Sequence, residues 1–82
     1  MNIQTAIIEG TNILKNKYIQ TAQLDTEILM AKALGKDRKY IVLNNNKYLK
    51  DKNLKLFEKL INERASRKPI AYLINKKFFW NF

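Results

Sequence analysis

Side chains that could carry out chemistry are scarce in this 82-residue sequence. It contains neither cysteine nor histidine, which excludes disulfides, thiolate metal sites and every nucleophile–histidine pair. Its seven carboxylates are expected on helix caps and exposed helix faces, not paired for acid–base work. The two glycines, Gly10 and Gly35, are too far apart to form a phosphate-binding loop. We therefore predict no catalytic, cofactor-binding or metal-binding residue here, and no self-contained enzyme.

The positive charge is concentrated in the second part of the chain. Sixteen Lys and Arg against seven Asp and Glu give a net charge of +9. Residues 1–31 have a net charge of −1, and residues 32–82 have a net charge of +10. This asymmetry favours an acidic partner, although a solvated, lysine-rich surface is an alternative interpretation. The cations most clustered at one predicted helix end, and hence our candidate partner-binding residues, are Arg64, Arg67 and Lys68.

A membrane location is not expected. No apolar run approaches the roughly 20 residues that a membrane span requires. The first residues lack the basic region and long apolar stretch of a signal peptide. We predict a soluble cytoplasmic protein.

Helices are the elements that must position these side chains. Apolar residues at three- and four-residue spacing predict a helix over about residues 3–16, with Asn2 as its cap. Gly10 lies on its apolar face, where it could let another helix pass close. A second helix is predicted to begin after Thr21 and to end at Gly35. Its expected apolar face consists of Leu24, Ile28, Ala31 and Leu34.

The second half of the chain is predicted to contain a short helix and a long one. The segment after Asp37 has strand propensity, but it is short and lacks a partner strand, so we predict one short helix. The longest helix should run from Asp51 to about Ser66. On its outward side, Glu63 and Arg67 are four residues apart and are predicted to form an ion pair.

The only proline separates this long helix from the end of the chain. Pro69 cannot continue a helix but can begin one, so a short closing helix is predicted to end at Asn75. Residues 76–82 then switch to aromatic side chains with strand propensity. These rings could fold back onto the bundle, but we favour the start of a strand whose partner lies elsewhere. The fold class is thus all-α, a bundle of about five helices over residues 1–75 with a strand-like tail.

Taken in order, several segments resemble the N-terminal domain of the HemK/PrmC family, the glutamine methyltransferases of peptide chain release factors. Leu24–Leu29 is similar to the family's "DAEILL" helix opening, and Leu34–Lys36 to the helix end that follows. The family signature "R…GEPIAYL.G…EFW" is matched by Arg64, Pro69–Leu73 and Phe79–Trp80.

Three positions depart from that signature. Arg67-Lys68 replaces Gly-Glu, Asn75 replaces a glycine, and Phe78 replaces an acid. The change from an acid to Lys68 alters any salt bridge that the family makes at this position.

The resemblance implies a non-catalytic domain that helps to recognise the release factor. Methyl transfer would belong to an absent catalytic domain that binds S-adenosylmethionine and holds the substrate glutamine through an Asn-Pro-Pro-Tyr motif. Residues 76–82 would begin the linker or β-hairpin toward it, and that domain would be a second partner. No catalytic residue carries over, because neither motif occurs in this sequence.

Another class of function also fits the composition. A stand-alone basic helical module could bind RNA or DNA through phosphate contacts and base stacking on Tyr40, Tyr48 and Phe78–Trp80. Against this, the lysines are expected around several helix faces, without helix-turn-helix spacing. A folded cap that only shields the enzyme's neighbouring surface is a further possibility.

Overall fold

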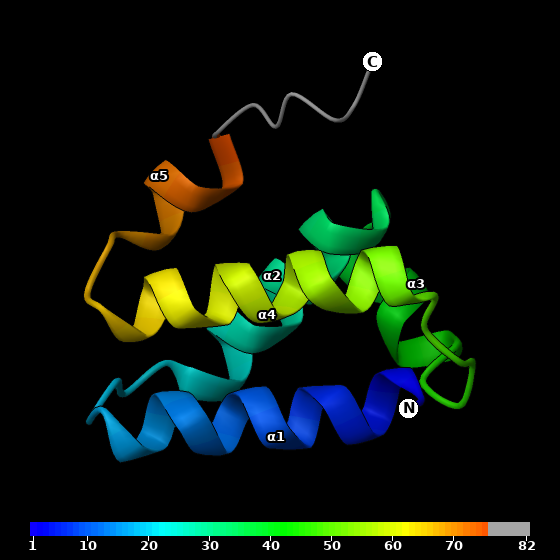
Figure 1. The fold of residues 1–82 in the computed structure, drawn as a ribbon, viewed down its shortest axis with the longest axis horizontal. Coiled ribbons are helices and arrows are strands. Elements are labelled where there is room, and N and C mark those ends of the chain that lie inside the picture. The colour runs from blue at the N-terminus through cyan, green and yellow to red at the C-terminus, as the bar shows by residue number, and fades with distance from the viewer. Residues whose placement is uncertain (76–82) are drawn as a thin grey trace.

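Within residues 1–75, five helices form a small all-α bundle, which confirms the predicted fold class (Figure 1). The structure is a computed structural model that describes residues 1–75; the predicted strand-like tail, residues 76–82, lies outside the described residues. The helices are α1 (Ile3–Asn16), α2 (Ala22–Leu34), α3 (Arg38–Leu43), α4 (Asp51–Ala65) and α5 (Ile70–Asn75).

Local capping explains several of these bounds. The side chain of Asn2 accepts a hydrogen bond from the backbone N–H of Thr5 at 2.8 Å, as predicted for the start of α1. Asp37 caps α3 in the same way through the N–H of Tyr40 at 2.9 Å, so this ambiguous segment is a helix. Gly35 ends α2 with a φ of 67°, in the left-handed region where glycine is favoured.

Gly10 is where three helices meet. A Cβ atom at this position would lie 2.9 Å from the Phe57 ring on α4, 2.9 Å from the Thr26 methyl group on α2 and 3.1 Å from Ile61. Glycine therefore lets the backbone of α1 approach both helices, and its predicted packing role is confirmed.

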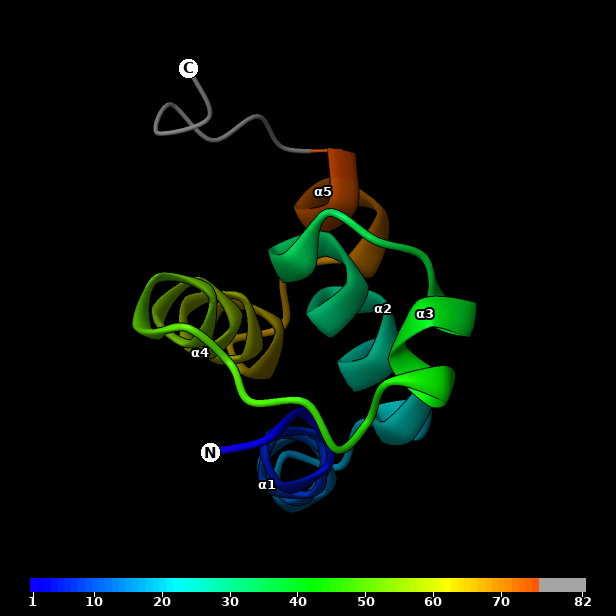
Figure 2. The same ribbon diagram turned by 90° about the vertical axis from the view of Figure 1, so that its right-hand side faces the viewer.

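The buried face of α2 differs from the prediction. Leu24 is 42% exposed, whereas Thr26 is fully buried and donates its hydroxyl to the carbonyl oxygen of Ala22. In Figure 2, α2 lies at the centre, with the other helices around it. Because neighbours cover several sides of α2, small and polar residues pack in tight contacts that apolar spacing does not reveal. Its buried residues are Ala22, Asp25, Thr26, Leu29, Met30, Ala31 and Ala33.

The C-terminal helices close the bundle as predicted. Phe57, Leu60 and Ile61 form the buried face of α4, and Leu73 of α5 is fully buried. Pro69 directly precedes α5, where its missing N–H leaves no helical hydrogen bond unmade. Among residues 1–75, no helix is long and apolar enough to cross a membrane.

Candidate docking surface

The three candidate partner-binding residues lie in one short segment, residues 64–68, which we call the α4–α5 turn. Arg64 is the least exposed of them, with 18% of its side chain accessible. Its Nε donates to Oδ2 of Asp25 at 2.9 Å, and its Nη1 donates to the backbone oxygen of Lys68 at 3.0 Å. Arg64 therefore links α2 to the end of the turn and fixes the chain just before Pro69.

Asp25 is a functional part of this arrangement that sequence reasoning missed. Its carboxylate is only 4% exposed, and it accepts hydrogen bonds from both Arg64 and the Thr21 hydroxyl, the latter at 2.9 Å. The expectation that the carboxylates lie on caps and exposed faces is wrong for this residue. Thr21 precedes α2 as predicted, but its side chain bonds Asp25 and makes no capping bond to the backbone. Asp25 and Arg64 are 39 residues apart, so no local spacing in the sequence indicates that they pair. The family-like Asp-Thr-Glu motif was the only sequence feature that singled out Asp25.

Arg67 occupies a strained backbone position. Its φ is 78°, in the left-handed region that costs a non-glycine residue about 1–2 kcal/mol. Residues in this geometry end many helices, and the position is usually glycine. This explains why the family signature has glycine here. The Arg67 side chain reaches across to α1, where Nη2 donates to the carbonyl oxygen of Lys17 at 2.6 Å.

Tyr18 is a second left-handed, non-glycine residue at the same end of the molecule. It follows Lys17, has a φ of 60°, and leaves 86% of its surface exposed. The N–H of Ile19 bonds to the oxygen of Leu14, which closes the end of α1 around it. No sequence pattern pointed to a role for Tyr18, which lies in the connection between α1 and α2. The hydrogen bond from Arg67 to Lys17 brings the two strained positions together.

Lys68 pairs with Glu63 in place of the Arg67 that we predicted. Its Nζ lies 2.9 Å from Oε1 of Glu63, and 46% of its side chain remains exposed. The hydrogen bond to Glu63, followed by the attraction of the Glu63 charge, raises the pKa of Lys68 above its usual value of 10.5. Arg67 lies beyond the end of α4 and is not in the α-helical conformation. The four-residue spacing therefore does not place its side chain beside Glu63.

The described residues do not fit S-adenosylmethionine. Binding the cofactor through a glycine-rich loop would require glycines at the end of a strand. Here Gly10 is packed inside a helix contact and Gly35 ends α2. No step of methyl transfer is therefore assigned to residues 1–75.

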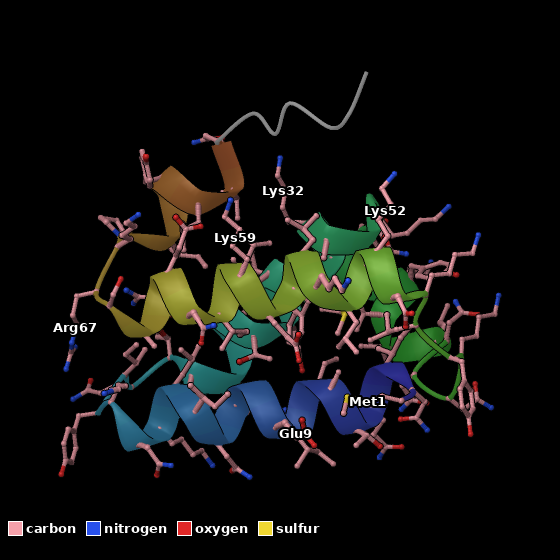
Figure 3. All side chains as sticks on the ribbon, in the orientation of Figure 1. Met1, Glu9, Lys32, Lys52, Lys59 and Arg67 are labelled. Carbon is pink, nitrogen blue, oxygen red and sulfur yellow. The ribbon has the colours of Figure 1, made fainter. Side chains whose placement is uncertain are left out.

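The basic side chains of residues 1–75 do not form a single patch. Figure 3 shows Lys52 and Lys59 projecting from α4 on the side away from α1, while Arg67 projects at one end of the molecule. The ring of Tyr40, a candidate for base stacking, has the ammonium groups of Lys36 and Lys47 within 5.2 and 5.6 Å of its centroid. These cation–π contacts occupy a surface that a nucleobase would need. Tyr48 remains 82% exposed.

Comparison with known proteins gives one consistent family. The model of the PrmC N-terminal domain matches residues 5–74. The chain is 32% identical over 79 residues to a release factor glutamine methyltransferase of Clostridium botulinum, covering 96% of this chain and 28% of that protein. It is 34% identical over 80 residues to the enzyme of the same name from Leptospira interrogans, covering 98% of this chain and 28% of that protein.

A third relative is longer. A bifunctional methyltransferase of Rickettsia felis is 29% identical over 80 residues, which cover 98% of this chain and 15% of that protein. No solved structure matches the chain. The chain thus spans less than a third of the length of these relatives.

Proposed function

Since this chain belongs to the PrmC N-terminal domain family, we propose that it serves as the non-catalytic helical domain of a release factor glutamine methyltransferase and docks the release factor. Methyl transfer from S-adenosylmethionine would belong to a catalytic domain, which would occupy part of the remaining length of such enzymes. Residues 76–82 would lead toward that domain. Such a protein would work in the cytoplasm, where translation terminates.

The observation that carries the docking role is the pair of strained, exposed positions at Tyr18 and Arg67. Strained backbone is retained where the surrounding structure and a function require it. Tyrosine and arginine are also the side chains that most often dominate binding energy at protein interfaces. Because Arg67 is already held by the Lys17 carbonyl, little conformational freedom would be lost on binding.

The cations of the α4–α5 turn have different roles in this proposal. Arg67 and Lys68 are exposed and would face an acidic surface of the release factor, where charge improves orientation and association rate. Arg64 is largely committed to Asp25, so its main part would be to hold the turn in place while its exposed edge borders the contact.

Calorimetry at low salt tests the docking role. The 82-residue chain is titrated with purified release factor from the organism that this chain comes from. The full-length Leptospira interrogans relative serves as a positive control. We expect measurable binding that Arg67→Gln weakens about tenfold, the equivalent of roughly 1.4 kcal/mol. Lys52→Gln removes the same charge from an exposed position on α4 and should leave the affinity nearly unchanged.

Two results would overturn the docking role. One is the absence of any complex with the chain while the full-length relative binds. The other is an equal effect of Arg67→Gln and Lys52→Gln, which would indicate general charge attraction. Tight RNA or DNA binding near physiological salt, with a steep fall in affinity as salt increases, would instead favour the nucleic-acid module.

A further inference from the structure

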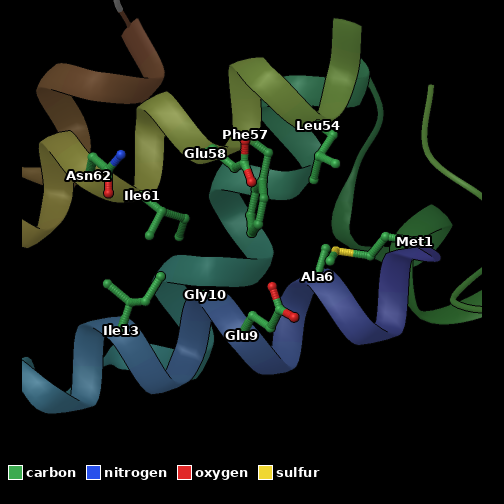
Figure 4. Close-up of a pocket in the computed structure, with 10 residues that line it drawn as sticks. All are labelled: Met1, Ala6, Glu9, Gly10, Ile13, Leu54, Phe57, Glu58, Ile61 and Asn62. Carbon is green, nitrogen blue, oxygen red and sulfur yellow. The ribbon is translucent and has the colours of Figure 1, made fainter. Parts of the chain in front are cut away.

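A groove of about 330 Å³ runs between α1 and α4 (Figure 4). Most of its lining residues are apolar, although polar atoms contribute about half of its surface. The apolar lining includes Ala6, Gly10 and Ile13 from α1, and Leu54, Phe57 and Ile61 from α4.

Two small residues of α1 line this groove. The helices approach each other at Gly10, where a Cβ atom would meet the Phe57 ring. Ala6 and Gly10 are both buried, so most of the surface that is open to water comes from the other lining residues. Ile13 at the edge is 41% exposed, so part of the apolar surface meets water.

Acidic residues flank this apolar groove. Glu9 comes from α1 and Glu58 from α4; both are exposed, and Figure 4 shows them on opposite sides of the opening. Neither carboxylate forms an ion pair with another of the described residues, whereas Asp25, Glu27 and Glu63 each do. No lysine or arginine of residues 1–75 lines the groove. The charged side chains that line it are therefore both acidic, on a chain whose net charge is +9.

We propose that this groove binds a basic amphipathic helix of a partner protein. The apolar side of that helix would cover Ile13 and Leu54, and its Lys or Arg side chains would reach Glu9 and Glu58. A helix laid into an apolar groove is a common mode of recognition, and complementary charge sets its specificity. This site is opposite in charge to the α4–α5 turn, and it stands whether or not that turn docks a release factor.

Two synthetic peptides separate the effect of the groove's own charge on binding from the effect of the net charge of the chain. One is a 14-residue amphipathic helix of leucine and lysine, and the other has glutamate at every lysine position. The net charge of +9 would attract the glutamate peptide, whereas the groove should prefer the lysine peptide. We expect fluorescence anisotropy to show tighter binding of the lysine peptide to the 82-residue chain, with amide NMR shifts centred on Ala6, Gly10 and Phe57.

Two double variants, each of which removes two negative charges, test whether Glu9 and Glu58 contribute to peptide binding. Glu9→Gln with Glu58→Gln should weaken lysine-peptide binding about tenfold, as expected for two exposed charge pairs. Glu27→Gln with Asp51→Asn removes the same charge from other surfaces and should have less than a twofold effect. Circular dichroism confirms that each variant is folded.

Three outcomes would overturn this assignment. The first is stronger binding of the glutamate peptide, and the second is equal weakening by both double variants. The third is a concentration-dependent dimer in sedimentation that Glu9→Gln with Glu58→Gln dissociates, which would make a second copy of this chain the occupant.

Discussion

The α4–α5 turn and the α1–α4 groove use charged residues in opposite ways. In the turn, Arg64, Arg67 and Lys68 each bond another group of the chain. In the groove, Glu9 and Glu58 form no ion pair with another described residue and border an apolar surface.

This difference separates a preorganised surface from an open one. Side chains already held in place lose little freedom when a partner arrives, so the turn suits rigid docking. The exposed carboxylates of Glu9 and Glu58 can change their rotamers when a partner segment brings basic side chains and apolar surface to the groove. Substitutions in each region should therefore have effects of different kinds.

Breaking the buried ion pair should have the largest effect on stability. Arg64→Met leaves the Asp25 carboxylate, 4% exposed, without its cation, and should lower the free energy of unfolding by about 3 kcal/mol. Urea denaturation measures this loss. The double variant Asp25→Leu with Arg64→Met removes both charges and should be less destabilised than Arg64→Met alone. A loss below about 1 kcal/mol for the single variant would show that the turn is not held by this pair.

Adding a methyl group at the base of the groove should have the next largest effect. Gly10→Ala brings a Cβ atom within 2.9 Å of Phe57 and Thr26, and the resulting overpacking costs about 1–3 kcal/mol. The better helix propensity of alanine offsets about 1 kcal/mol of that. Chemical denaturation should show a net loss of about 1 kcal/mol.

Two controls identify the cause of that loss. Asn12→Ala, at an exposed position of the same helix, should be neutral or slightly stabilising. In a Phe57→Leu background, Gly10→Ala should cost less, because the ring that it meets is gone. Equal costs in both backgrounds would show that the Phe57 ring is not the neighbour that opposes the added methyl group.

Relieving the strain in the turn should stabilise the fold but weaken docking. Arg67→Gly matches the family signature and removes the left-handed penalty of about 1–2 kcal/mol at a φ of 78°. The greater freedom of glycine in the unfolded chain offsets part of this, so the free energy of unfolding should rise by about 0.5–1 kcal/mol. The same change deletes the guanidinium and should weaken release-factor binding in calorimetry. Arg67→Ala keeps the strain and should weaken binding without the gain in stability. A loss of stability in Arg67→Gly would mean that the bond to Lys17 outweighs the strain.

The smallest effect should come from the exposed pair of Lys68 and Glu63, and it should depend on pH. Because the pKa of Lys68 is raised in the folded state, its contribution to stability is complete below 10.5 and is lost as pH rises through the folded value. Urea denaturation of the chain and of Lys68→Met, between about pH 8 and 11, should show a small difference that disappears at the alkaline end. A difference that stays constant with pH would indicate packing of the lysine stem.

Most helix bounds could be predicted from short-range chemistry. The residues that begin or end these helices act on backbone groups within a few residues of themselves, so their effects can be inferred from the neighbouring sequence. They are Asn2, Asp37, Gly35 and Pro69. The clustering of cations before Pro69 located the α4–α5 turn, although it could not give the geometry of Arg67.

What the sequence alone determined is an all-α bundle with its basic turn before Pro69. The tertiary structure decided which carboxylate is buried, which face of α2 is covered and where two carboxylates border a groove. Asp25 with Arg64, and Glu9 with Glu58, are each brought into one region by helix packing, although they are far apart in the chain. Contacts of this kind depend on how helices cross, and Gly10 sets that crossing through neighbours on two other helices.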